Sequence, residues 1–95
     1  MTQFDINHQS SGNTGRYSIA LDDGSEAEMT YRMAGEVMAI DHTFVPRRHR
    51  GGQIAESLVV RGVEDARAKG LKIDPVCPYV AVQFRRHPEW RDLLA

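Results

Sequence analysis

The sequence lacks the features that are typical of secreted and membrane proteins. Cys77 is its only cysteine, so an internal disulfide is impossible and a reducing compartment is favoured. No uninterrupted apolar run approaches the ~20 residues that a membrane-spanning helix needs. The opening residues, Met1 to Asp5, lack the basic and apolar regions of a signal peptide. We therefore expect a cytoplasmic protein with no membrane partner.

The chain also lacks an excess of either charge. Its 12 Lys and Arg residues are matched by 13 Asp and Glu residues, which gives a formal net charge of −1. Such a protein has no long-range field that would attract nucleic acid. Positive charge is concentrated at residues 47–50 and 85–86, and no aromatic residues interleave with the arginines at 47, 48 and 50. The composition therefore disfavours nucleic-acid binding.

Repeats, linkers and low-complexity segments are absent, and 95 residues suffice for one core but not for two. We therefore expect a single domain over residues 1–95. Candidate strands lie at about 3–8 and 16–22, with a loop at 10–15 between them.

The middle of the chain continues this strand pattern. A tight turn is expected at Asp22-Asp-Gly-Ser25, because Asp-Gly tolerates the positive φ of hairpin turns. Apolar and polar side chains then alternate from 26 to 33, which predicts a strand with one buried face. Gly35 turns the chain into another strand at 36–45. The first half is thus predicted to be an antiparallel meander.

The second half changes its periodicity. Apolar residues at three- and four-residue steps predict an amphipathic helix over 53–69, and Gly70 would end it as a C-cap. A short strand is expected at 71–76 and a second helix at 79–86. A strand, a crossover helix and a further strand make a parallel unit. The expected fold class is α/β (α+β), with a mixed central sheet and a C-terminal helix.

The segment Thr43-Phe-Val-Pro-Arg-Arg-His-Arg-Gly-Gly-Gln-Ile-Ala-Glu-Ser-Leu58 passes from a strand through a basic turn into the long helix. Backbone N–H groups at a helix start lack intrahelical partners, and the helix dipole adds positive potential there. Gly51 and Gly52 leave the backbone accessible, and full positive charges come from Arg47, Arg48 and Arg50. The segment therefore predicts a cradle for a diphosphate.

This order of elements, with Arg50-Gly-Gly-Gln-Ile-Ala55 opening the helix, resembles the GNAT superfamily of acetyl-CoA-dependent N-acetyltransferases. The superfamily motif is Q/R-x-x-G-x-G/A. Arg50 and Ala55 match its ends, whereas Gln53 replaces a glycine. Asp41-His-Thr-Phe-Val-Pro46, Gly70-Leu-Lys-Ile-Asp-Pro-Val-Cys-Pro-Tyr-Val80 and Arg86-His-Pro-Glu-Trp90 resemble a group of very short GNAT-like proteins. The resemblance covers residues 16–93.

The resemblance implies that acetyl-CoA lies between a splayed fourth and fifth strand. Its pantetheine arm would pair with the backbone of Phe44 and Val45. Its pyrophosphate would contact the amides of the following residues: Arg50, Gly51, Gly52, Gln53, Ile54 and Ala55. The acceptor would be a primary amine. Because the family's last two strands have no counterpart here, the acceptor site would be open, or completed by a homodimer or another partner.

Three residues are candidates for the chemistry. Cys77 is either a buried core residue or a thiol near the thioester, acting there as general acid or as transient acyl acceptor. Tyr79 is the rival general acid. His42 shares the strand parity of Ile40 and Phe44, and is either a core or cleft histidine or the base that deprotonates the amine.

The remaining histidines carry less information. His49 is expected to be a solvated turn residue. No metal site is expected from His42, His49, Cys77 and His87, because no close ligand pair has a characteristic spacing. The alternatives to an N-acetyltransferase are a non-catalytic CoA-binding module and, less favoured, a small nucleic-acid-binding domain.

Overall fold

In a computed structural model, residues 4–95 form one mixed sheet with two α-helices and two short 3-10 helices. The strands are β1 (Asn7–Ser11), β2 (Thr14–Ala20), β3 (Glu26–Ala34), β4 (Val37–Phe44) and β5 (Lys72–Pro75). The α-helices are α1 (Ile54–Lys69) and α2 (Pro78–Arg86), and the 3-10 helices are η1 (Arg47–His49) and η2 (Pro88–Leu93).

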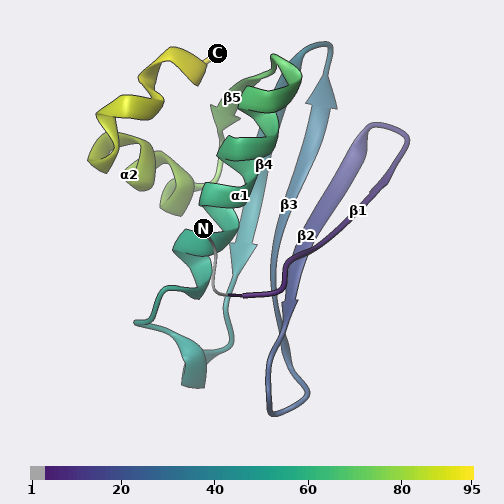
Figure 1. The fold of residues 1–95 in the computed structure, drawn as a ribbon, viewed down its shortest axis with the longest axis vertical. Coiled ribbons are helices and arrows are strands. Elements are labelled where there is room, and N and C mark those ends of the chain that lie inside the picture. The colour runs from purple at the N-terminus through teal and green to yellow at the C-terminus, as the bar shows by residue number, and fades with distance from the viewer. Residues whose placement is uncertain (1–3) are drawn as a thin grey trace.

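The sheet has the order β1-β2-β3-β4-β5 (Figure 1). The first four strands are antiparallel neighbours, and β5 runs parallel to β4. The helix α1 makes the crossover between β4 and β5, and α2 follows β5. The predicted fold class is therefore confirmed: a meander, a parallel strand–helix–strand unit and a C-terminal helix on a mixed sheet.

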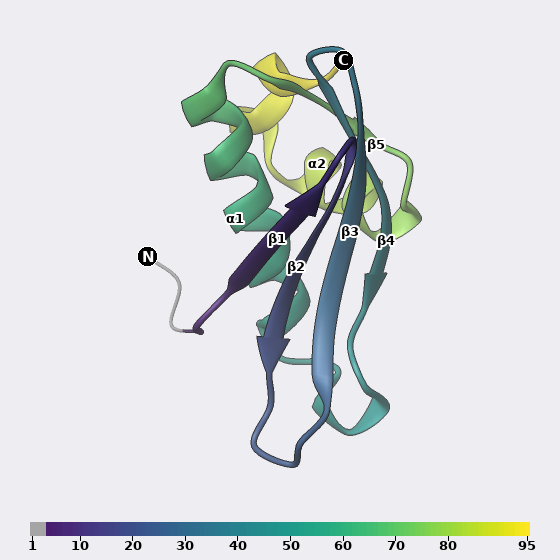
Figure 2. The same ribbon diagram turned by 90° about the vertical axis from the view of Figure 1, so that its right-hand side faces the viewer.

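Helix α1 lies against one face of the sheet, which we call the inner face (Figure 2). The predicted stripe is buried here, with Leu58, Val59 and Ala66 fully inaccessible. Gly62 allows a close approach, because a Cβ at this position would lie 2.9 Å from the Cε of Met29. Gly70 ends the helix in the left-handed conformation, with φ 69°, as the sequence predicted.

A half-buried polar cluster also ties α1 to the sheet. The hydroxyl of Tyr17 donates a 2.8 Å hydrogen bond to the Asp65 carboxylate on α1. His8 on β1 stacks on the Tyr17 ring at 4.2 Å, and its Nε2 lies 2.8 Å from the Tyr31 hydroxyl. Burial and this carboxylate raise the pKa of Tyr17, so the phenol remains protonated and holds the hydrogen bond.

The N-terminal strand differs from its prediction. The strand expected at 3–8 is observed at Asn7–Ser11, and Gln3 lies outside the described residues. The loop expected at 10–15 is a tight turn instead, because Ser11 pairs with Thr14 and Gly12 has φ 60°. This strand lies at the sheet edge and its side chains are mostly exposed, so it has no apolar alternation for the sequence to display.

The outer face of the sheet, opposite α1, is open. Across strands β1 to β3 no helix of residues 4–95 lies on this face (Figure 2). Its side chains are mostly polar and include Arg16, Glu28 and Thr30. Within the described residues, no helix has the length and apolarity that crossing a membrane would require.

Candidate functional site

Strand β4 pairs with β5 over only the first half of β4. Residues Val37–Ile40 pair with Lys72–Pro75, whereas β4 continues to Phe44 beyond the last pair. Pro75 has no N–H to continue the ladder, and Pro78 starts α2. The Cys77 backbone N–H donates to the Ile40 carbonyl at 2.8 Å, at the point where the strands separate. We call the space beyond it the β4–β5 gap.

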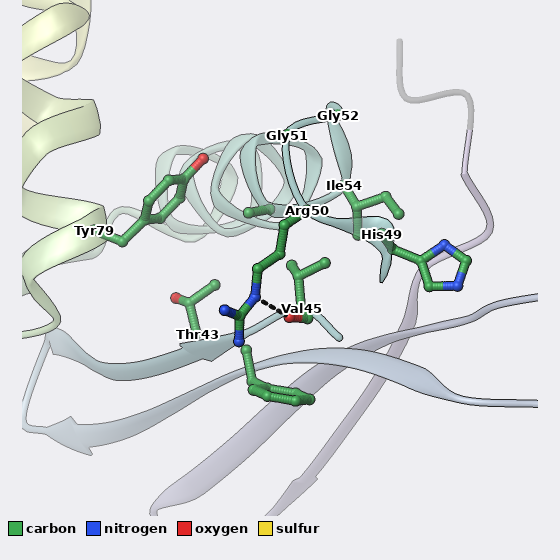
Figure 3. Close-up of a pocket in the computed structure, with 10 residues that line it drawn as sticks. Thr43, Val45, His49, Arg50, Gly51, Gly52, Ile54 and Tyr79 are labelled. Carbon is green, nitrogen blue, oxygen red and sulfur yellow. Dashed lines mark hydrogen bonds between the residues drawn. The ribbon is translucent and has the colours of Figure 1, made fainter. Parts of the chain in front are cut away.

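A pocket of about 410 Å³ opens beside this gap. Its walls come from the end of β4, the turn before α1, the first turn of α1 and the start of α2 (Figure 3). The lining residues are Thr43, Phe44, Val45, His49, Arg50, Gly51, Gly52, Ile54, Ala55 and Tyr79. All of the predicted cofactor-binding residues except Gln53 are among them. Their binding role stays a prediction.

The turn before α1 has the local geometry of an anion site. Gly51 has φ 87°, which other residues rarely adopt, and a Cβ at Gly52 would approach nothing closer than the His49 carbonyl oxygen at 4.0 Å. Gln53 is the N-cap residue that precedes α1, and its carbonyl accepts a hydrogen bond from the Ser57 N–H at 2.9 Å. The backbone N–H groups of the first helical turn face outward from the helix start, where an anion would be favoured.

The Arg50 side chain extends from the turn towards the strand and does not fold back over the helix start (Figure 3). Its Nε donates a 2.8 Å hydrogen bond to the Val45 carbonyl, and its guanidinium carbon lies 6.0 Å from the Phe44 ring centroid. Arg50 therefore places a positive charge inside the pocket, between the strand end and the turn.

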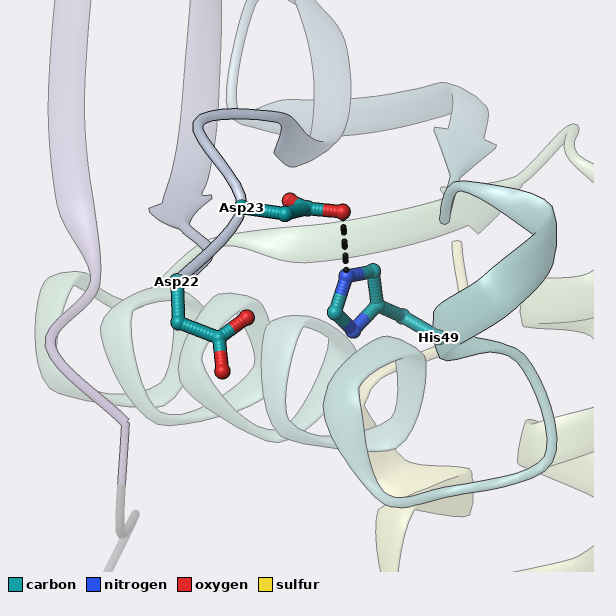
Figure 4. A group of neighbouring side chains, drawn as sticks. All are labelled: Asp22, Asp23 and His49. Atoms are coloured by element: carbon teal, nitrogen blue, oxygen red, sulfur yellow. Dashed lines mark hydrogen bonds and ion pairs between the residues drawn. The ribbon is translucent and has the colours of Figure 1, made fainter.

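A second turn, between β2 and β3, holds the basic turn in place. The Asp23 carboxylate lies 3.1 Å from the His49 Nε2 and 3.4 Å from an Arg48 nitrogen (Figure 4). Hydrogen bonds from Ser25 and from His49 and Arg48 lower the pKa of Asp23. His49 is thus a pocket-lining residue with a partner, and its expected role as a solvated turn residue is wrong.

The carboxylates of Asp22 and Asp23 and the His49 ring also lie close enough together to suggest a cation site (Figure 4). However, the Arg48 guanidinium shares the Asp23 carboxylate and would repel a metal ion there. We interpret this group as a clamp between two turns. The prediction that the protein has no metal site stays a prediction.

Cys77 and Thr43 meet at the mouth of the β4–β5 gap. The Cys77 thiol donates to the Thr43 hydroxyl at 3.7 Å and is only 7% exposed. Thr43 lines the pocket, whereas Cys77 lies behind it. Sequence reasoning missed Thr43, because an isolated threonine in a strand gives no functional signal. Its position became clear only from its pairing with the buried Met29 on β3.

Tyr79 lines the same pocket from the first turn of α2. Burial raises its pKa, and the nearby Glu56 carboxylate on α1 raises that pKa further. A phenol ordinarily titrates near 10, so this environment keeps Tyr79 protonated at neutral pH and able to donate a proton.

His42 lies on the other face of the sheet from these residues. The pairing of β3 with β4 skips Asp41, so that His42 opposes Thr30 while Ile40 opposes Tyr31. This bulge places Asp41 and His42 together on the outer face, and the prediction that His42 is in step with Ile40 is wrong. The His42 side chain is 53% exposed, and its Nε2 lies 3.4 Å from the Glu28 carboxylate. It is not a core histidine.

The structure thus defines an α/β protein with a mixed sheet and a pocket beside a split strand pair, and comparison with known proteins identifies the family. The family model of the GCN5-related N-acetyltransferases matches residues 16–93. The solution structure of a GCN5-like putative N-acetyltransferase from Staphylococcus aureus is 28% identical, with a TM-score of 0.73, over 100% of this chain and 91% of that one. The crystal structure of a putative acetyltransferase from Agrobacterium tumefaciens is 25% identical, with a TM-score of 0.58, over 88% of this chain and 60% of that one.

The chain therefore belongs to the GCN5-related N-acetyltransferase family. The resemblance inferred from the sequence motifs is confirmed, including its extent along the chain.

Proposed function

We propose that this protein binds acetyl-CoA in the β4–β5 gap and transfers the acetyl group to a primary amine. The observation that carries the proposal is the pocket itself, which joins a strand end without a β5 partner, a glycine-rich helix start and a half-buried phenol. The diphosphate would lie at the start of α1, near Gly52 and Ile54. The pantetheine arm would use the backbone of Phe44 and Val45, which β5 leaves unpaired.

The two faces of the sheet suggest separate roles in the transfer. Tyr79 and the Cys77–Thr43 pair lie on the inner side of the gap, and His42 lies on the outer face. An amine approaching from the outer face would lose its proton to His42 and attack the thioester carbonyl carbon. The carbon–sulfur bond then breaks, and Tyr79 or Cys77 protonates the departing thiolate. A backbone N–H near Phe44 or Val45 would hold the developing oxyanion.

Cys77 also allows a two-step route. Its thiolate would first attack the thioester carbonyl, forming a carbon–sulfur bond to Cys77 while the bond to the CoA sulfur breaks and CoA leaves as the thiolate. The neutral amine would then attack the acetyl-cysteine, forming a carbon–nitrogen bond while the bond to the Cys77 sulfur breaks, and the thiolate would take up the amine proton. The buried position of the thiol, behind Thr43, favours the direct route. A non-catalytic CoA-binding module would share the pocket but would transfer nothing.

The test is calorimetric titration of CoA into the wild-type protein and into Arg50→Glu. Replacing the pocket guanidinium by a carboxylate removes a charge-assisted contact, worth about 1.5–3 kcal/mol, and adds repulsion. The affinity should fall roughly tenfold or more. Arg47→Glu is the matched control, because Arg47 is exposed in the same turn and does not line the pocket. Equal affinity of the wild type and Arg50→Glu, with both folded, would refute the pocket as the CoA site.

Catalysis is tested separately by incubation with acetyl-CoA and a panel of amines, with mass spectrometry of the amines and of the protein. Acetylated amine indicates an N-acetyltransferase. CoA binding without any acetylated product indicates the binding module instead.

A further inference from the structure

The outer face of the sheet carries a second hollow, of about 360 Å³, beside the bulge in β4. It runs across β1 to β4, and its polar lining includes Gln9, Arg16, Arg32 and Asp41. The volume is in the range of small-ligand sites. Because Asp41 directly follows Ile40, the last β4 residue paired with β5, one end of the hollow adjoins the β4–β5 gap.

The two guanidinium groups in this hollow differ in what they contact. Arg16 donates to the carboxylates of Glu26 and Glu28 at 2.8 and 2.7 Å, so its charge is neutralised within the protein. The exposed side chain of Arg32 makes no hydrogen bond or ion pair with any residue of 4–95. Arg32 is therefore the cation in the hollow that is available to a ligand anion.

The opposite charge lies at the end of the hollow nearest the gap. Asp41 accepts a 2.7 Å hydrogen bond from the Thr30 hydroxyl through one carboxylate oxygen. No cationic group of residues 4–95 forms an ion pair with Asp41, and Arg32 does not reach it. His42, the residue next to Asp41, shares the outer face. An ammonium group at Asp41 would thus lie beside the histidine that could deprotonate it.

We propose that this hollow is the acceptor site and that the acceptor is a small amine that also bears a carboxylate. Its amino group lies at Asp41, facing the gap, and its carboxylate binds Arg32. Two opposite charges at separate positions of one hollow, neither of them in an ion pair within residues 4–95, select a zwitterion over a bare amine. The inference rests on the proposed function, because only that function makes the hollow an acceptor site.

The experiment is a set of NMR titrations on the full chain saturated with CoA. The probes are a series of ω-amino acids of increasing length, each paired with the alkylamine that lacks its carboxylate and with the carboxylic acid that lacks its amine. We expect the amino acids to shift amide signals at 14–16, 30–32 and 41, and to bind at least several-fold more tightly than either partner. The Arg32→Gln substitution should lower the affinity for the amino acids by about tenfold, equivalent to ~1.4 kcal/mol. It should leave the affinities for the alkylamines and for CoA unchanged. Arg32→Lys, which keeps the charge, should restore part of the difference.

Equal binding of amino acids and alkylamines, no effect of Arg32→Gln, or no response of the outer face to any probe would each overturn the proposal. CoA is followed in the same spectra through the amide signals of residues 50–55. If CoA fails to bind while the amino acids still shift the outer-face signals, the proposed function is lost and the zwitterion site stands. If CoA binds and no probe shifts the outer-face signals, the zwitterion site is refuted and the proposed function stands.

Discussion

The two ends of β4 lie in one strand but have different surroundings. At one end, Val37–Ile40 pair with β5, and Met38 and Ile40 are buried against the helices. At the other end, Thr43 and Phe44 have no β5 partner and line a pocket. A bulge at Asp41 and the proline that ends β5 separate these environments. The comparison suggests that the paired end determines stability, whereas the open end determines binding.

The largest expected effect is at the paired end. Ile40 is fully buried, so Ile40→Ala should remove about 2–5 kcal/mol from the free energy of unfolding. Urea denaturation measures the loss. Val37→Ala is the matched control, because Val37 is paired with β5 but only half-buried. If the two variants lost the same stability, burial at the paired end would not be what supports the fold.

At the open end, Gly52→Asp should have the opposite profile. A Cβ at Gly52 meets no close neighbour, so the thermal midpoint should stay near that of the wild type. The added carboxylate would lie where the diphosphate is expected, and CoA affinity should fall about tenfold or more. Gly52→Ala, which adds the Cβ without the charge, should retain most of the affinity. Parallel loss of stability and affinity in Gly52→Asp would mean that the glycine serves the backbone instead.

Cys77 lies where the two ends meet, and its substitution sharpens the comparison. If it is a core residue alone, Cys77→Ser should destabilise the protein slightly and leave acetyl transfer unchanged. An acyl acceptor should gain one acetyl group from acetyl-CoA, and serine should abolish this adduct. A general acid should show no adduct, yet serine should lower kcat with little change in CoA affinity. Tyr79→Phe is the companion variant: a lower kcat there, with full activity in Cys77→Ser, would assign the proton to the phenol.

The smallest effect should be at the turn that holds the open end in place. The pKa of Asp23 is lowered by hydrogen bonds from Ser25 and then from His49 and Arg48. A carboxyl with a lower pKa in the folded chain adds stability above its unfolded value, about 3.9, and that contribution is lost as the pH falls. The difference in Tm between the wild type and Asp23→Asn should therefore shrink below pH ~4.

Asp22→Asn is the control for this titration, since Asp22 makes no ion pair within residues 4–95. It should change Tm less than Asp23→Asn at neutral pH. A constant difference between the wild type and Asp23→Asn across the acid range would show that the clamp does not depend on the carboxylate charge.

Elements with a regular apolar pattern or a terminating glycine were predicted correctly from the sequence. The stripe of α1 and the Gly70 cap follow from helical periodicity, and the alternation at 26–33 follows from the one buried face of β3. The edge strand β1 was misplaced because its Asn, His, Gln and Ser side chains carry no apolar pattern. Its position depends on pairing with β2 and on the turn at Gly12.

The candidate site was also predicted only in part from the sequence. The glycine-rich helix start could be recognised from residue types alone, and those residues do line one pocket. The positions of His42 and Thr43 could not, because a bulge is a mismatch between two strands and neither sequence shows it. The clamp between Asp23 and His49 joins turns 26 residues apart, and no local pattern reports such a contact.

The hydrogen bond from Arg50 to the Val45 carbonyl has a consequence for how a ligand would enter. A pantetheine arm that approaches this carbonyl along the same direction displaces the guanidinium, and binding then exchanges one hydrogen bond for another. Side-chain rotation takes picoseconds to nanoseconds and would not limit association. The equilibrium nevertheless loses about 0.5–1.5 kcal/mol of the gain from the new contact. A substitution that shortens Arg50 would therefore free the Val45 carbonyl for the ligand and at the same time remove a cation. The measured change in CoA affinity would be the difference between these two effects, and it would understate the strength of the proposed contact with phosphate.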